Sequence, residues 1–266
     1  MNASHAPVHR RHALRAGAAA AVALTAGCGE HDAGTSAGAV THAAPRKPAA
    51  TAAGAHAPAP APRRFPGQPV QITHGPRDRA RVALTFHGQG DPAVARTVLG
   101  EAERAGARVT VLAVGSWLDE HPEMARRILD GGHDLGNHTQ HHIDISALDE
   151  TRAYAEITGC AQRLRRLTGS IGTWFRPSRA QSATPLVQRL AARAGYPHVL
   201  SYDVDSLDFT SPGAAAVTRK VAGEIRNGSV VSLHFGYADT VAALPLLLTE
   251  IDRRGLRAVT TTELLT

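Results

Sequence analysis

From residue 65 onward, short apolar runs alternate with longer amphipathic stretches, and this alternation restricts the fold more than any other feature of the sequence. The apolar runs predict seven strands, at residues 81–86, 108–114, 134–137, 173–176, 199–204, 229–235 and 257–261. The amphipathic stretches predict helices between them, at residues 92–105, 119–130, 146–168, 183–194, 212–227 and 240–254. Repeated β-then-α units form a parallel sheet, so we predict a single α/β domain over residues 65–266 with enough strands to close into a barrel.

The composition of the chain is that of a globular protein with a basic surface. Hydrophobic residues make up 43% of the sequence, charged residues make up 20%, and the formal net charge is +6. Basic residues are nearly all arginines, and they are scattered along the domain instead of forming the basic stripe of a nucleic-acid-binding protein. We therefore expect no nucleic-acid partner. The sequence gives no prediction of the oligomeric state.

Residues 1–28 have the pattern of an export signal. Arg10, Arg11 and Arg15 precede a short stretch of small apolar residues at 16–27, which is too short for a membrane-spanning helix. The following Leu-Thr-Ala-Gly-Cys resembles a lipobox, with Thr25 where Leu is usual. We predict that the protein is exported and anchored to the cell membrane by a lipid on Cys28. The alternative is a cleaved secretory signal, and the export route, general or twin-arginine, stays open.

Residues 29–64 are rich in Ala, Pro, Gly, Thr and His and show no hydrophobic periodicity. Such a segment buries too little apolar surface to offset its ordering entropy, so we predict a disordered tether. Membrane contact is then expected only through the N-terminal lipid. The second cysteine, Cys160, falls within a predicted helix of the domain, and we interpret it as a small buried apolar residue.

Polar residues follow nearly every predicted strand, at 87–91, 137–142, 175–178, 203–208 and 233–236. In a parallel barrel these positions meet at one end, where function collects. Among them, His138 and His142 are four residues apart, which on a helical turn would place both imidazoles on one side and suits a metal site. The alternative is that both histidines are capping or surface residues. His141 is expected to point elsewhere.

The domain resembles the polysaccharide deacetylase (NodB-homology) family over about residues 68–266. The stretches that carry the resemblance occur in family order at 114–118 (VGSWL), 122–123 (PE), 132–139 (GHDLGNHT), 168–169 (TG), 175–177 (FRP), 205–208 (DSLD), 233–234 (LH), 240 (T) and 244–245 (LP). The resemblance implies a distorted (β/α) barrel of about seven parallel strands, the NodB-like deacetylase fold.

The family roles carry over to matching positions. The resemblance implies that His138 and His142 bind a divalent metal, usually Zn²⁺, and that His234 is the general acid. It further implies that Arg176 positions the catalytic base, and that Asp205 or Asp208 tunes His234, with Asp208 preferred. The structural alternatives are that Asp205 caps a loop and that Arg176 pairs with a buried carboxylate.

The first motif of the family is Thr-Phe-Asp-Asp-Gly, whereas this sequence has Thr-Phe-His-Gly-Gln at 85–89. His87 therefore stands at the position of the base, and Gly88 at the position of the third metal ligand. Three ways to compensate for these changes remain open: His87 is the third metal ligand, Asp91 is the third metal ligand, or His87 acts as the base. Further departures are Ser-Arg-Ala at 178–180, where Pro-Tyr-Gly is usual, and Phe209, where Trp is usual.

We therefore predict a metal-dependent hydrolase that removes N-acetyl groups from an amino-sugar polymer of the cell envelope, with peptidoglycan or chitin-like chains as candidate substrates. The alternative is a carbohydrate-binding or wall-associated lipoprotein that keeps the fold but has lost turnover. A third class, amide or ester hydrolysis on a non-sugar substrate, is compatible with the same fold.

Overall fold

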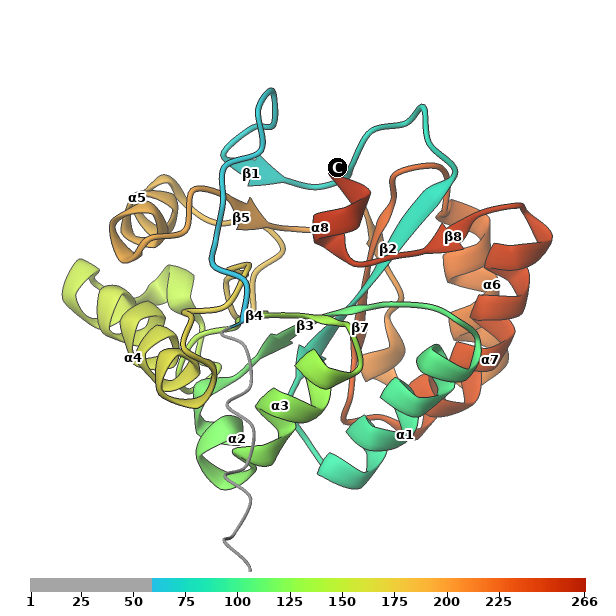
Figure 1. Ribbon diagram of the computed structural model, residues 1–266, viewed down its shortest axis with the longest axis horizontal. Helices are drawn as coiled ribbons and strands as arrows, with labels where there is room; N and C mark the ends of the chain where they lie inside the picture. The colour runs from blue at the N-terminus through green and yellow to red at the C-terminus, as the bar shows by residue number, and fades with distance from the viewer. Residues whose placement is uncertain (1–58) are drawn as a thin grey trace, which may run out of the picture. The chain divides into compact units, whose positions relative to one another are not determined.

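The computed structural model describes residues 59–266, so the predicted signal and the lipidation site at Cys28 lie outside the described residues. A mainly parallel sheet runs through the domain (Figure 1). Its strand order is β4–β3–β2–β7–β6, with β8 beside the start of β2, and β1 pairs with β5. The strands are β1 (Gln71–Ile72), β2 (Arg81–Gly88), β3 (Thr110–Ala113), β4 (Asp134–Asn137), β5 (Val199–Leu200), β6 (Val204–Asp205), β7 (Val230–His234) and β8 (Arg257–Ala258).

Strand β2 is the centre of the sheet. Seven of its eight residues are buried, with Val82, Leu84 and Phe86 in one hydrophobic cluster and Ala83 in another. It pairs in parallel with β3 and β7, and the register with β7 sets His87 directly opposite His234. The predicted parallel α/β fold is confirmed, and the ends of β2 and β7 carry two of the predicted site residues side by side.

The two ends of the strand order are joined by the chain itself. At one end, Phe175 forms parallel bridges to Asn137 of β4 and to Val199 of β5. At the other end, β6 pairs with β7. Because β5 and β6 are separated by residues 201–203 alone, this short stretch connects opposite ends of the sheet. The path follows the barrel that the family resemblance implies.

Two predicted strands take a different form. The prediction at 199–204 covers two strands, because Ser201 N–H donates to Ile72 O of β1 whereas Asp203 N–H donates to Val230 O of β7. Each half of the stretch thus pairs with a different neighbour, which requires a bend between them. The prediction at 173–176 corresponds to the bridges of Phe175 alone.

The helices surround the sheet on two sides, with α4 and α5 on one side and α1, α6 and α7 on the other (Figure 1). Their bounds are α1 (Pro92–Arg104), α2 (Gly115–Glu120), α3 (Glu123–Asp130), α4 (Glu150–Thr168), α5 (Pro185–Ala194), α6 (Ala214–Glu224), α7 (Ala238–Arg253) and α8 (Thr261–Leu264). Short 3₁₀ helices cover Ile145–Ala147 and Asp208–Thr210. No helix of the described residues has the length and apolar character needed to cross a membrane.

The helix predicted at 119–130 is two helices. The break falls at His121, whose φ of −130° and ψ of 62° lie outside the helical region, and Pro122 precedes α3. The ring of a proline disfavours helical backbone angles at the residue before it. Pro122 therefore causes the break at His121. α2 is thereby free to turn, and its residue Trp117 packs near Phe235 at the end of β7.

Two further interpretations can be compared with the structure. Cys160 is fully buried and free, and burial raises the pKa of its thiol to about 12, as expected for an inert core residue. Ala59 and Pro60, which belong to the predicted tether, already contact the domain, because Ala59 N–H donates to Thr168 O and Ser170 Oγ donates to Pro60 O. Ala59 and Pro60 therefore pack with the domain.

Candidate active site

Three histidines meet beyond the carboxyl ends of the central strands. His87 comes from the end of β2, His138 follows β4 directly, and His142 lies in the loop after it. One nitrogen from each ring lies within 4.8 Å of the others. The ring centroids are 4.4 Å apart for His87 and His138, and 4.9 Å apart for His138 and His142. Three imidazole nitrogens at this spacing form a cluster that could hold one metal ion.

Hydrogen bonding leaves the cluster ready to accept a cation. His138 Nδ1 lies 3.1 Å from Arg176 O, and because a carbonyl only accepts, Nδ1 carries the proton. The lone pair of His138 therefore lies on Nε2, which is buried and has no partner in the described structure; the same holds for His142 Nε2. Buried nitrogens without a partner are rare and point to a missing ligand. The donor set fits a divalent metal that prefers nitrogen.

Burial also fixes the charge state of these histidines. Desolvation lowers the pKa of His87 and of His138 well below 6.5, and the neighbouring histidines lower it further. Desolvation, followed by the positive charge of Arg179, lowers the pKa of His142 to about 4. Neutral imidazole is the form that binds metal, so the fold holds the cluster in its metal-binding state at neutral pH.

The loop that carries His138 and His142 is not the helical turn that the four-residue spacing suggested. Thr139 and His142 have φ angles of 70° and 55°, in the left-handed region, and these angles turn both imidazoles to one side. The loop is fastened from within, because Thr139 N–H donates to Asn137 Oδ1 and His142 N–H donates to Thr139 Oγ1. Ser178, at an altered family position, accepts from Thr139 Oγ1 and donates to Ile143 O.

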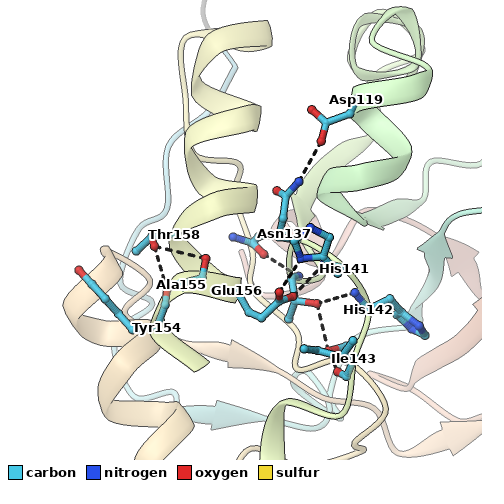
Figure 2. Close-up of polar contacts among 12 residues, drawn as sticks. Asp119, Asn137, His141, His142, Ile143, Tyr154, Ala155, Glu156 and Thr158 are labelled. Atoms are coloured by element: carbon cyan, nitrogen blue, oxygen red, sulfur yellow. Dashed lines mark hydrogen bonds and ion pairs between the residues drawn. The ribbon is translucent and has the colours of Figure 1, made fainter. Parts of the chain in front are cut away.

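A buried glutamate on α4 fastens the same loop from outside. Glu156 accepts the backbone N–H of His141 at 2.8 Å and interacts with His141 Nδ1 at 2.7 Å (Figure 2). His141 thus points away from the cluster, as the sequence predicts. The sequence did not predict a role for Glu156, because this residue lies in the middle of a helix, far from any strand end. The one available signal was a single acidic residue on the buried face of an amphipathic helix.

His234 and Asp208 form a second unit beside the cluster. Asp208 accepts His234 N–H at 2.8 Å, pairs with His234 Nδ1 at 2.7 Å and accepts from Thr240 Oγ1 at 2.5 Å. Burial alone would raise the pKa of Asp208, but the hydrogen bonds from His234 and Thr240 outweigh it and hold the pKa below its ordinary value. The His234 ring centroid lies 4.3 Å from that of His87.

The two candidate partners of His234 take different places. Asp208 is fully buried against His234. Asp205 instead accepts Leu207 N–H at 3.1 Å and so caps its own loop. Of the two aspartates, the structure brings Asp208 to the histidine.

Arg176 is fully buried beneath the site. Its Nε donates to Leu200 O and its Nη2 to Ser201 O, whereas Nη1 is buried without a partner in the described structure. Desolvation lowers the pKa of the guanidinium to about 10, which leaves it charged at neutral pH. No ion pair joins Arg176 to a carboxylate of the described residues, so the simple buried pair weighed from the sequence is not formed there.

Neither Asp91 nor position 88 adds a ligand to the cluster. Asp91 caps α1, with Oδ1 accepting Ala93 N–H at 2.8 Å. Gly88 continues β2 and pairs with Ala113 of β3. A Cβ atom at Gly88 would lie 2.9 Å from Val111 Cγ1 and 3.0 Å from Ala113 Cα, so a side chain there would collide with β3.

Comparisons with known proteins agree with this geometry. Residues 74–199 match the family described as Polysaccharide deacetylase. A peptidoglycan-N-acetylglucosamine deacetylase of Bacillus cereus is 30% identical over 194 residues, covering 71% of this chain and 90% of the relative. A chitooligosaccharide deacetylase of a Bradyrhizobium species is 28% identical, covering 65% of this chain and 85% of the relative. A solved CE4 family pseudoenzyme from Bacillus anthracis has the same fold, with a TM-score of 0.70 at 22% identity, covering 75% of this chain and 70% of that one.

We expect Gly88→Asp to lower the free energy of unfolding by about 1–3 kcal/mol, the usual cost of forcing extra atoms into a packed site. Val111→Ala removes the Cγ1 atom that the new Cβ would meet at 2.9 Å. The double variant should therefore be more stable than the sum of the two single effects by at least about 0.5 kcal/mol. Urea denaturation measures this coupling. A Gly88→Asp variant as stable as the wild type would show that β3 shifts to make room for the side chain at no cost in stability.

We expect Glu156→Gln to weaken Zn²⁺ binding by about 10–100-fold, the usual effect of removing a group that orients a metal-binding segment. Glutamine keeps one accepting oxygen but lacks the second oxygen and the negative charge, so the two carboxylate contacts with His141 cannot both be kept. Glu150→Gln is the matched control, because Glu150 is an exposed residue of the same helix that pairs with Arg193. Competition with a chromogenic chelator measures the affinity. Equal affinity of both variants would mean that Thr139 and Ser178 hold the loop without Glu156.

We expect the metal-free protein to lose stability as the pH falls below about 6.5. The pKa of His142 is about 4 in the folded chain, against 6.5 when unfolded, so between these values the unfolded chain binds more protons. The full stability is present above pH 6.5 and is lost progressively toward pH 4. Chemical denaturation in chelator across this range measures the slope, which His142→Gln should reduce. An identical slope in that variant would contradict the low pKa.

Proposed function

Because the chain belongs to the polysaccharide deacetylase family, we propose that it is a metal-dependent hydrolase that removes N-acetyl groups from an amino-sugar polymer of the cell envelope. One observation carries the proposal: the open Nε2 atoms of His138 and His142 lie in a three-histidine cluster beside the His234–Asp208 pair. Such an arrangement places a cation site and a proton-transfer group within reach of one acetamide.

His87, His138 and His142 would hold the metal. Three histidines with one open position are a known ligand set for catalytic zinc, and Zn²⁺ is the metal we propose. When bound, the metal polarises the acyl carbonyl and lowers the pKa of a water molecule. In this assignment His87 supplies the ligand that Gly88 lacks, so the site keeps three protein ligands without the carboxylate of the family motif.

His234 would carry the proton. Its Nδ1 is engaged by Asp208, so Nε2 is the atom that faces the reacting groups. A neutral His234 accepts the proton of the attacking water at Nε2 and then returns it to the departing amine nitrogen. The carboxylate of Asp208 stabilises the imidazolium between these steps, as the aspartate does in serine hydrolases. One histidine then performs both proton transfers, and His87 is free to be a ligand.

The competing assignment makes His87 the base. Its ring lies between those of His138 and His234, and Ser232 Oγ is 3.2 Å from Nε2. In that case His138 and His142 alone would bind the metal, and the binding would be weak.

A second function is a carbohydrate-binding protein without turnover. Two observations favour it: β3 closes the space at Gly88, and the guanidinium of Arg176 has no carboxylate partner among the described residues. On either function we propose that the protein is exported and held at the membrane by a lipid on Cys28, as the lipobox-like sequence suggests.

The deciding experiment measures zinc stoichiometry and acetate release from an N-acetylglucosamine oligomer for four proteins. We expect one tightly bound zinc in the wild type, its loss in both His138→Ala and His87→Ala, and its retention in His234→Ala. The last variant should release acetate about 10²–10⁴-fold more slowly, the usual effect of losing an acid–base group.

Other outcomes separate the alternatives. Zinc lost in the His138 variant but kept in the His87 variant would assign His87 as the base. If the wild-type protein binds the oligomer, binds no zinc and releases no acetate, it is the non-catalytic binding protein.

A further inference from the structure

A groove of about 500 Å³ begins at His234 and runs along the end of the sheet toward α2. Its lining includes Gln89, Ser116, Trp117, Glu120 and Tyr237. Because His234 lines the same groove, a polymer whose reacting unit lies at His234 could extend into it. The groove is thus a place where a neighbouring sugar unit could be bound.

The charge of this groove differs from that of the chain as a whole. The sequence carries 29 basic and 23 acidic residues, yet no lysine or arginine is among the described residues that line the groove. Glu120 is its one carboxylate, and it is exposed. The groove is thus locally negative, although the protein is positive.

The carboxylate of Glu120 is also free, in contrast to its neighbours. Asp119 pairs with Arg163 and accepts from Gln140 Nε2 (Figure 2). Glu123 pairs with Arg96. Within the described residues no ion pair or hydrogen bond engages the carboxylate of Glu120, so a ligand would not have to displace an internal partner.

Two aromatic side chains complete the groove. The Tyr237 ring stands at 85° to the His234 ring, with the centroids 5.8 Å apart. The Trp117 ring is fixed, because Nε1 donates to Gly90 O at 2.8 Å. Trp117 is buried and forms part of the groove wall, whereas Tyr237 is partly exposed, so its ring can contact the apolar face of a sugar ring or a nearby cation.

We propose that this groove is a subsite for an amino sugar whose nitrogen is already free, so that the protein prefers an N-acetylglucosamine unit whose neighbour is glucosamine. This inference rests on the proposed function. The protonated amine would pair with Glu120, whereas an N-acetylated neighbour offers no charge and a carboxylated neighbour is repelled. The preferred polymer is accordingly one that has already been partly deacetylated.

The test compares binding of a glucosamine trimer and an N-acetylglucosamine trimer to the full chain by calorimetry. Glu120→Gln should weaken binding of the glucosamine trimer about two- to five-fold, the range of an exposed ion pair, and leave binding of the acetylated trimer unchanged. High salt should remove the difference between wild type and variant. Glu123→Gln, an exposed carboxylate on the adjacent helix, should change neither affinity.

The other possible results of this binding experiment would contradict the subsite or the deacetylase proposal. Unchanged binding of the glucosamine trimer in Glu120→Gln, or an equal loss for both trimers, would overturn the subsite. Failure of the wild type to bind the glucosamine trimer would overturn it as well. If both trimers bind as expected but no acetate is released, the deacetylase proposal fails while the subsite stands, because binding does not depend on turnover.

Discussion

The parallel pairing of β2 with its neighbours is the constraint on which the site depends. In parallel strands the carboxyl ends lie at one edge, and here the register places His87 of β2 opposite His234 of β7. A slip of one residue would turn His87 to the opposite face of the sheet. The register is secured by burial, because β2 is buried along almost its whole length and Phe86 stacks on Phe235 with centroids 5.1 Å apart. The hydrophobic core thus determines the distances between the histidines of the candidate site.

The electrostatic balance of the site is unusual for a cation-binding centre. The histidines avoid charge by remaining neutral, but Arg176 cannot. Its guanidinium donates to two backbone carbonyls and lies over the face of Tyr202, and no carboxylate of the described residues forms an ion pair with it. Asp208 is already engaged by His234. A divalent ion would add positive charge to this centre without a carboxylate ligand to offset it. Its affinity therefore depends on the rigidity of three neutral imidazoles, which gives the contacts of the 138–143 loop their importance.

The sequence allowed the fold class and most site positions to be predicted, for separate reasons. Apolar periodicity located the strands and helices, and the family resemblance selected His138, His142, Asp208 and His234. Pro122 could have predicted the broken helix, since its effect on the preceding residue is local. The division at 201–203 and the contact of Glu156 with His141 arise from neighbours distant in sequence. Local patterns carry no information about such contacts.

The changes at positions 87 and 88 are best understood together. Glycine lets β2 continue one residue further, with Gly88 O accepting Val114 N–H and β3 lying where a Cβ atom would be. The last side chain of β2 that enters the site is then that of His87. An imidazole is longer than the carboxylate of aspartate, and it reaches a ring-centroid distance of 4.4 Å from His138. An aspartate at 87 with glycine at 88 would leave two nitrogen ligands beside a shorter acidic group. In the proposed assignment the histidine and the glycine therefore form one coupled change, in which His87 supplies the ligand that Gly88 cannot.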